Sequence, residues 1–188
     1  SALDLSHVNL EVCRDTKQQL QQALTAGELD IIITHESDIL HHSQFEYCRL
    51  GHYQELLVCH PGHDFAKTPI INTNELSQYR ELIWGEVDDD NNQYTTQHSD
   101  GYSPSYGIFS DIQLLITMLK HNKGYAFLPA DAVANDIKAG KLIAIDCDFE
   151  PSGINRRIEL CWRNGLTLST HGKTLVDAFK NKHQLSAY

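Results

Sequence analysis

The sequence predicts an α/β fold, because strand-like and helix-like segments alternate along the chain. The clearest strand is GELDIIIT, residues 27–34, in which three successive isoleucines lead into Thr34. A β-branched run this short is typical of a strand that is covered on both faces, as in a parallel sheet. Glycines at 27, 124 and 140 follow helix-like segments, where a left-handed residue ends a helix. The alternation therefore predicts mostly parallel sheets flanked by helices.

The N-terminal part of the chain reads as a strand–helix–strand unit. The stretch VNLEVC, residues 8–13, alternates apolar and polar residues and predicts a strand. Asp15 or Thr16 can cap a helix that runs to about Ala26. The strand in 27–34 follows, and its crossover is expected to be right-handed.

The same pattern of helix, glycine and strand returns twice in the second half of the chain. Apolar residues spaced three and four apart mark the helices, and short apolar runs mark the strands. The predicted elements after residue 50 are strand 53–60, helix 110–121, strand 125–129, helix 130–139, strand 141–145, strand 156–162 and a last helix from Ser169.

The most polar stretch of the chain is DDDNNQYTTQHSDGYSPSYG, residues 88–107. It is long for a loop inside a compact domain, which favours a surface excursion or a functional flap. A solvated loop without a role is the alternative.

Composition excludes several classes of protein. The 188 residues are 41% hydrophobic, enough to form a core, and their formal net charge is −10. A net acidic chain is not expected to bind nucleic acid alone, because Lys and Arg supply most of that affinity. No apolar run reaches the length of about 18 residues that spans a membrane, and no signal segment opens the chain.

Neither the cysteines nor the histidines form a recognisable site. The five cysteines include no CxxC pair, and three lie in apolar runs, so buried free thiols in a reducing compartment are expected. The tightest histidine groups are His41–His42 and the pair His60 and His63, which lack zinc-ligand spacing. Phosphate-loop, dinucleotide, serine-hydrolase and HExxH motifs are absent. No catalysis, metal or cofactor is therefore expected.

Several stretches together resemble the effector-binding domain of LysR-type transcriptional regulators. The matching stretches, in the family's order, are LxxALTAGELDIIIT (20–34), ELLVCHPGHDFA (55–66), NELSQYRELI (74–83), LITMLKHNKGYAFLPA (115–130), IKAGKLIAI (137–145) and RIELCWRNG (157–165). Each is weak alone, but the ordered set covers nearly the whole chain. The family's first strand and helix have no counterpart here.

The resemblance implies a two-lobed fold like that of the periplasmic binding proteins, with a small effector in the cleft between the lobes. Lobe I would comprise residues 1–50 and 163–188, and lobe II residues 51–162. The chain would cross between the lobes near 49–53 and 159–162.

The resemblance also implies a bacterial, cytoplasmic regulator that self-associates as a dimer or tetramer. Such a regulator binds DNA only through a helix-turn-helix domain that this sequence does not contain. A secreted solute-binding protein of the same fold, and a metal enzyme that uses the histidines, are the alternatives.

Effector contacts are expected where strands end and helices begin, because ligands of parallel sheets bind beyond the carboxyl ends of the strands. Hydroxyls, a Lys and a His at these places favour a small organic anion, since free helix N–H groups attract negative charge. Asp15 and Asp111 count against this, because either can occupy those N–H groups. The candidate contacts are Thr16, Lys17, Thr34, His35, Phe109 and Ser110.

Overall fold

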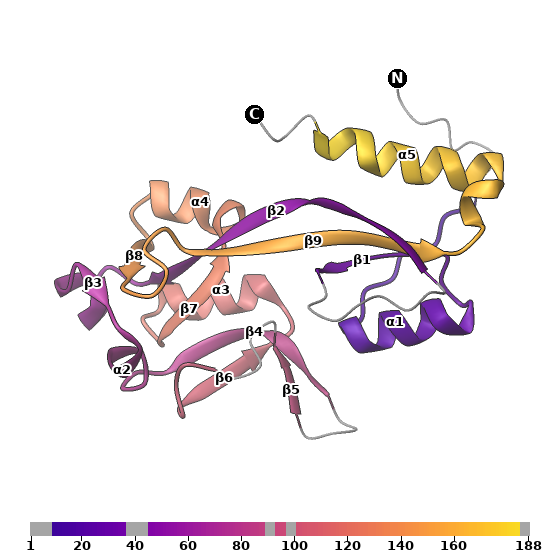
Figure 1. Cartoon of the computed structure of the whole chain (residues 1–188). Helices are drawn as coiled ribbons and strands as arrows, with labels where there is room; N and C mark the ends of the chain where they lie inside the picture. Colours follow the sequence, from indigo (N-terminus) through magenta and orange to yellow (C-terminus); the bar gives the residue numbers. More distant parts are fainter. Residues whose placement is uncertain (1–8, 37–44, 89–92, 97–100, 185–188) are drawn as a thin grey trace. The chain divides into compact units, whose positions relative to one another are not determined.

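The computed structural model describes residues 9–36, 45–88, 93–96 and 101–184 (Figure 1). The chain divides into two compact units. Unit 1 comprises Ser1–His52 and Arg156–Tyr188, and unit 2 comprises Tyr53–Asn155. Two long strands, β2 (Phe45–Cys59) and β9 (Ile154–Arg163), contribute residues to both units.

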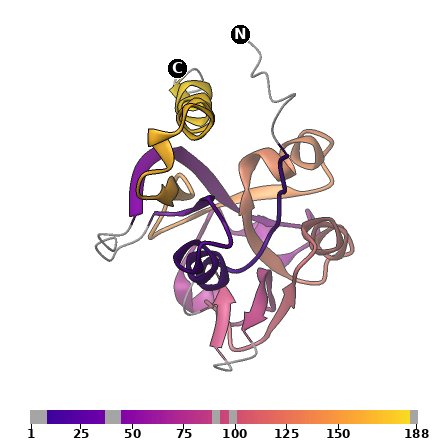
Figure 2. The ribbon, with the colours of Figure 1, turned by 90° about the vertical axis from the view of Figure 1, so that its right-hand side faces the viewer.

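Unit 1 is a sheet with a helix on each face. Strand β1 (Ile31–His35) pairs antiparallel with β9, and β9 neighbours β2. The remaining elements of the unit are α1 (Lys17–Ala26), η2 (Leu166–Leu168) and α5 (Thr170–Gln184). Figure 2 shows α1 and α5 on opposite sides of these strands.

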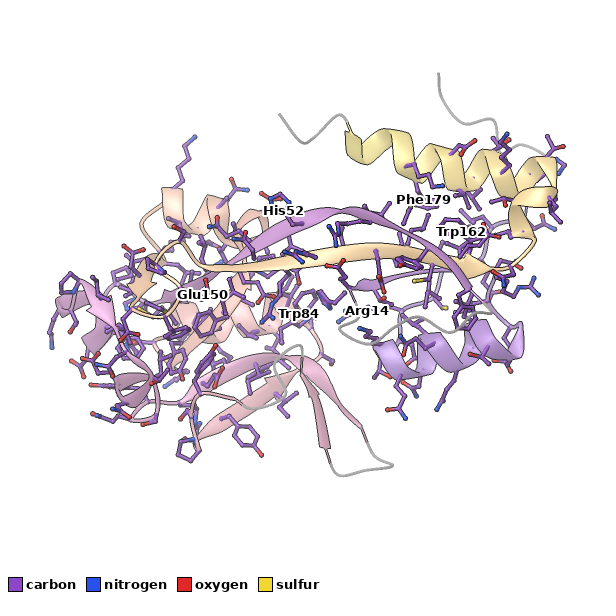
Figure 3. The ribbon with its side chains drawn as sticks, in the orientation of Figure 1. Arg14, His52, Trp84, Glu150, Trp162 and Phe179 are labelled. Atoms are coloured by element: carbon purple, nitrogen blue, oxygen red, sulfur yellow. The ribbon has the colours of Figure 1, made fainter. Side chains whose placement is uncertain are left out.

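The two faces of the unit 1 sheet pack separate apolar clusters. Leu24 of α1 lies with Ile32 and Cys161 on one face. Trp162 lies with Val176 of α5 on the other face, with Phe179 packed against them (Figure 3). Alternate residues of β9 therefore face different helices, as the pleat of a strand requires.

Two strand predictions in unit 1 are corrected by the structure. Residues 9–13, described without their first predicted residue, form no strand, and Leu10 and Val12 are 59% and 83% exposed. A strand needs a neighbour for its backbone N–H and C=O groups, and no described strand lies against this segment. Strand β1 is not covered on both faces either, because Ile33 is 44% exposed.

Unit 2 is a mixed sheet covered on both faces. Parallel pairs join β4 to β6, β4 to β7 and β3 to β8, whereas β2 pairs antiparallel with β7 and β8, and β4 with β5. The elements are η1 (Asp64–Lys67), β3 (Ile70–Ile71), α2 (Thr73–Leu76), β4 (Glu81–Asp88), β5 (Gln93–Thr96), β6 (Tyr106–Phe109), α3 (Ile112–Lys120), β7 (Tyr125–Pro129), α4 (Ala130–Lys138) and β8 (Ile143–Cys147).

The central strand β7 divides the core of unit 2 into two clusters. Ala126 and Leu128 face the helices α3 and α4. Tyr125 and Phe127 face the opposite cluster, which includes Phe65 of η1. Four of the five residues of β7 are buried. The predicted helices and strands after residue 50 are all present, the last two in unit 1. The pattern did not predict β3, α2, β4, β5 and β6, and the sheet is mixed rather than mostly parallel.

Two details in unit 2 differ from the expectation. The polar stretch 88–107 contains β5, which forms a hairpin with β4, although residues 89–92 and 97–100 lie outside the described part of the chain. Helix α3 ends at Lys120, and Asn122 rather than Gly124 takes the left-handed conformation, with φ of 56°. Gly124 is required for another reason, because a Cβ there would clash with the carbonyl oxygen of Arg80.

Candidate functional site

The structure assigns the candidate effector contacts to both units. Thr16, Lys17, Thr34 and His35 belong to unit 1 and are called the unit 1 half-site. Phe109 and Ser110 belong to unit 2 and, with their neighbours, form the unit 2 half-site. Each half-site is described within its own unit.

In unit 1, the start of α1 lies at the level where β1 ends. Gly27 closes α1 with a φ of 79°, and β1 begins four residues later, so the two elements run in opposite directions. Helix and strand are each roughly 15 Å long at their usual rise per residue. Lys17 is consequently level with His35, and its ammonium lies near enough to Cys161 of β9 to act on that thiol's pKa.

The N-terminus of α1 is already capped. The Thr16 hydroxyl accepts a hydrogen bond from the Gln19 N–H at 3.2 Å and donates to Gln19 Oε1 at 2.7 Å. Asp15 Oδ1 accepts the Thr16 N–H at 2.8 Å. The helix N–H groups are thus used by the protein itself, and the charged side chains at this helix end are those of Arg14, Asp15 and Lys17.

Thr34 is a buried polar residue opposite a buried acid. It is 8% exposed and pairs across the ladder with Glu159 of β9, which is 1% exposed. The Thr34 hydroxyl donates to the carbonyl oxygen of His35 at 3.2 Å. Glu159 also hydrogen-bonds Cys161, and burial together with this carboxylate raises the pKa of the Cys161 thiol to about 12. Glu159 was not predicted, although an acid inside the apolar run of 156–162 is a signal that could have revealed it.

The strand end after His35 carries an ion-pair cluster. The Glu36 carboxylate binds Arg49, whose Nε lies 2.9 Å away, and Arg157, whose Nη1 lies 3.4 Å away. The hydrogen bonds from Arg49 are the main cause that lowers the pKa of Glu36. This carboxylate is thus compensated by two guanidinium groups, so it opposes a ligand anion near His35 only weakly.

In unit 2, parallel strands bring an unpredicted tryptophan beside the half-site. Trp84 of β4 is in register with Phe109 of β6, and its indole N–H donates to the carbonyl oxygen of Ser110 at 3.4 Å. Figure 3 labels Trp84 in this unit. The sequence signal for it is weak, because pairing of β4 with β6 joins residues 25 positions apart.

Asp111 occupies the helix N-terminus that follows Ser110. Its Oδ1 accepts the N–H groups of Gln113 at 2.7 Å and Leu114 at 3.3 Å, which caps α3. The free N–H groups expected there are therefore used by the protein itself. An aromatic pair, Trp84 and Phe109, beside a capped helix is suited to the apolar part of a ligand rather than to its charge.

The two histidines of HPGH, His60 and His63, accept hydrogen bonds from backbone N–H groups two residues later in the chain. His60 Nδ1 accepts the Gly62 N–H at 2.9 Å, and His63 Nδ1 accepts the Phe65 N–H at 3.2 Å. His41 and His42 lie outside the described residues. Across the part of the chain that is described, no three His, Cys, Asp or Glu side chains are placed to hold a metal ion.

All five cysteines are free thiols, and the prediction of buried thiols in the strand-like runs is confirmed for Cys59 and Cys161 but is wrong for Cys13. Cys59, Cys147 and Cys161 are buried, and burial is the main cause that raises each thiol's pKa to about 12. Cys48 is half-buried and Cys13 is exposed. Because thiolates are the reactive form, the three buried thiols are inert at neutral pH.

The comparison with protein families decides the identity of the domain. The profile of the LysR substrate binding domain matches residues 4–184. The chain belongs to this family. The LysR domain described here thus senses an effector for a transcriptional regulator, and its family is regulatory. A comparison with curated proteins finds no match.

Solved structures with the same fold are regulatory domains. The MetR domain from N. meningitidis has a TM-score of 0.69 at 14% identity, covering 88% of this chain and 78% of that chain. The HypT domain from Salmonella typhimurium has a TM-score of 0.66 at 20% identity, covering 91% of this chain and 80% of that chain.

The reduced OxyR domain from Pseudomonas aeruginosa gives a TM-score of 0.66 at 15% identity, over 91% of this chain and 80% of that chain. These TM-scores, together with the family match, show the fold, which is the periplasmic-binding-protein-like α/β fold of LysR regulatory domains. In the described part of the LysR domain, no helix has the length and apolar character needed to cross a membrane.

Proposed function

We propose that the LysR domain binds a small organic anion through the unit 1 half-site, and the apolar part of the same molecule through the unit 2 half-site. The two units are proposed to be the two lobes, with residues 156–162 in lobe I. Both half-sites are assigned to one ligand because the family resemblance implies an effector held by both lobes.

The observation that carries this proposal is the contrast in charge between the half-sites. Lys17 supplies a cation at the end of β1, where Glu36 is already compensated by Arg49 and Arg157. Asp111 places a carboxylate at the unit 2 half-site, beside the aromatic rings of Trp84 and Phe109. Taken by itself, unit 1 therefore favours a carboxylate at Lys17, and unit 2 favours a hydrocarbon group at Trp84.

Glu159 is the observation that works against an anion, so the experiment must test charge directly. Its buried carboxylate lies opposite Thr34 and repels a negative group placed there. Calorimetric titration of small carboxylates alongside their uncharged primary amides separates the two cases. We expect a carboxylate to bind and its amide to bind at least about tenfold more weakly, a difference of about 1.4 kcal/mol.

Two threonine variants make the titration specific. Thr34→Val removes a buried hydroxyl of the proposed site and should weaken binding. Thr25→Val removes an exposed hydroxyl of α1 that only donates to the Gln21 carbonyl oxygen, and it should leave binding unchanged. A carboxylate that binds both variants and the unaltered chain equally would place the site elsewhere.

We further propose that this LysR domain acts within a longer, cytoplasmic regulator that self-associates as a dimer or tetramer. In that protein, DNA would be bound by a separate helix-turn-helix domain. The net charge of −10 supports this division of labour, because an acidic domain repels phosphate. Retention of a specific operator fragment by this chain alone would contradict it.

A further inference from the structure

The loop that leads into β6 is held by the first residue of β4. Glu81 is 2% exposed, and its Oε2 accepts the backbone N–H groups of Tyr102 at 2.7 Å and Ser103 at 3.2 Å. Hydrogen bonds to a carboxylate are shorter and stronger than those between neutral groups. Two adjacent backbone positions of the loop are thus fixed by one buried side chain.

Ser103 adds a second layer of hydrogen bonds to the same loop. It is 5% exposed, and its hydroxyl donates to the Tyr79 carbonyl oxygen at 2.6 Å while accepting the Ser105 N–H at 3.1 Å. The Ser105 carbonyl oxygen in turn accepts the Glu81 N–H at 2.9 Å. The loop is therefore hydrogen-bonded both to Tyr79, which precedes β4, and to Glu81, the first residue of β4.

Aromatic packing of Tyr102 and the absence of a side chain at Gly101 allow the loop backbone to lie close to Glu81. The Tyr102 ring lies 5.2 Å from the Phe149 ring and nearly parallel to it, with Phe127 at 5.1 Å. At Gly101, a Cβ atom would lie 3.1 Å from Glu81 Oε2, so a side chain there would press on the carboxylate. The glycine lets the loop backbone approach the acid.

The hydrogen bonds that Glu81 and Ser103 make with this loop are called the clasp. The clasp acts on the unit 2 half-site, which lies one strand-length away. Strand β6 starts directly after the clasp and pairs with β4 in the register Glu81 to Tyr106 through Trp84 to Phe109. Because a strand changes register only in whole steps that turn every side chain to the other face, fixing the entry of β6 also fixes Phe109 and Ser110 against Trp84.

We infer that Glu81 is a positioning residue for the unit 2 half-site, acting through the register of β6. This rests on the proposed function of that half-site. A buried carboxylate is costly, and apolar side chains of similar volume can replace buried ionic groups at no loss of stability. A purely structural role could therefore be filled by an apolar side chain, whereas holding two backbone N–H groups at once requires a side-chain oxygen as acceptor.

The test uses Trp84 as a reporter and no ligand, so it does not depend on the identity of the effector. The chain has two tryptophans, and Trp162→Phe leaves Trp84 as the only indole. In this background, Glu81→Ala should increase amide hydrogen exchange at 102 and 103 by about tenfold or more. It should also shift Trp84 emission to longer wavelength. Glu81→Gln should restore both, because its amide oxygen can accept the same N–H groups.

Two further variants separate positioning from general destabilisation. Trp84 packs against the core cluster beside α3 and α4, so the control is taken from the other cluster of unit 2. Ile71→Ala removes a fully buried side chain there and should lower stability while leaving Trp84 emission unchanged. Gly101→Ala presses on the Glu81 carboxylate and should shift the emission in the same direction as Glu81→Ala, even if the latter fails to fold.

The inference is overturned if Glu81→Ala folds with unchanged Trp84 emission, if Glu81→Gln fails to restore it, or if Gly101→Ala leaves it unchanged. None of these results bears on whether an anion binds. Conversely, a failed titration of carboxylates leaves the exchange and emission results intact, so the two proposals fail separately.

Discussion

Similar apolar strands are buried to different extents in the two units. In unit 2, β7 has four buried residues of five and packs a cluster on each face. In unit 1, β1 has two buried residues of five, and the exposed fraction of Ile33 is 44%. An apolar sequence therefore makes a strand possible, but the elements that pack against it decide how much of the strand is buried.

The largest expected effect tests this contrast directly. Leu128→Ala in β7 removes a fully buried side chain and should lower the free energy of unfolding by about 2–5 kcal/mol. Ile33→Ala in β1 should cost less than about 1 kcal/mol, because that side chain is already partly in water. Denaturant unfolding of both variants measures the difference. Equal losses would mean that Ile33 is covered in solution.

The elements of unit 2 that were predicted have local signals, whereas β3, α2, β4, β5 and β6 were not predicted. Helix α3 is marked by apolar residues at helical spacing, and YAFLP marks β7. The strand predicted in 8–13 carries an equally good local pattern, yet residues 9–13 form none. Strand formation depends on a partner that is remote in sequence, and local alternation contains no information about it.

The site was predictable in part for the same reason. Strand ends and helix starts can be read from the sequence, which gave Thr34 and Ser110 as candidates. Trp84 was missed because neither β4 nor its partner β6 was predicted as a strand. Glu159 was missed although β9 and β1 were both predicted, because a strand pattern does not show which two strands pair. The capping role of Asp111 was foreseen as an alternative, and the structure contains it.

Unit 2 holds a histidine inside its core. His63 is 7% exposed, its Nδ1 accepts the Phe65 N–H, and its ring packs against Phe65 and Tyr79 at 4.5 Å and 4.9 Å. Burial is the main cause that lowers the pKa of His63, partly opposed by the charge of Asp64.

The sign of the resulting pH dependence follows from this lowered pKa. Below about pH 6.5 the unfolded chain binds a proton at His63 that the folded chain resists, so stability should fall as the pH drops. The slope for one proton is at most about 1.4 kcal/mol per pH unit. His63→Asn can still cap the turn but cannot titrate, so its unfolding free energy should change less steeply below that pH. Parallel curves for the two proteins would exclude His63 as the cause.

A buried hydroxyl gives a smaller test of the same core. The Tyr125 hydroxyl is buried and has no hydrogen-bond partner among the described residues. Tyr125→Phe should therefore leave the free energy of unfolding unchanged or raise it by up to about 1 kcal/mol.

Tyr53→Phe is the matched control for that substitution. The Tyr53 hydroxyl donates to the buried Glu55 carboxylate at 3.2 Å, so its removal should lower stability. Thermal unfolding of both variants is sufficient. Destabilisation by Tyr125→Phe as large as that by Tyr53→Phe would reveal an ordered partner for the Tyr125 hydroxyl.

The smallest effect is expected at the Glu36 ion-pair cluster of unit 1, whose arginine side chains are exposed. Glu36 binds Arg49 and Arg157, whose side chains are 61% and 65% exposed. Exposed ion pairs contribute little and are screened by salt. Glu36→Gln should therefore lower the unfolding midpoint only slightly, and molar salt should abolish the difference. Because Arg49 lowers the pKa of Glu36, the pair stabilises the fold at neutral pH and loses this effect as the pH falls through that lowered pKa. The difference between the two proteins should accordingly vanish in acid as well. A large effect that survives salt would show that this cluster is shielded from solvent.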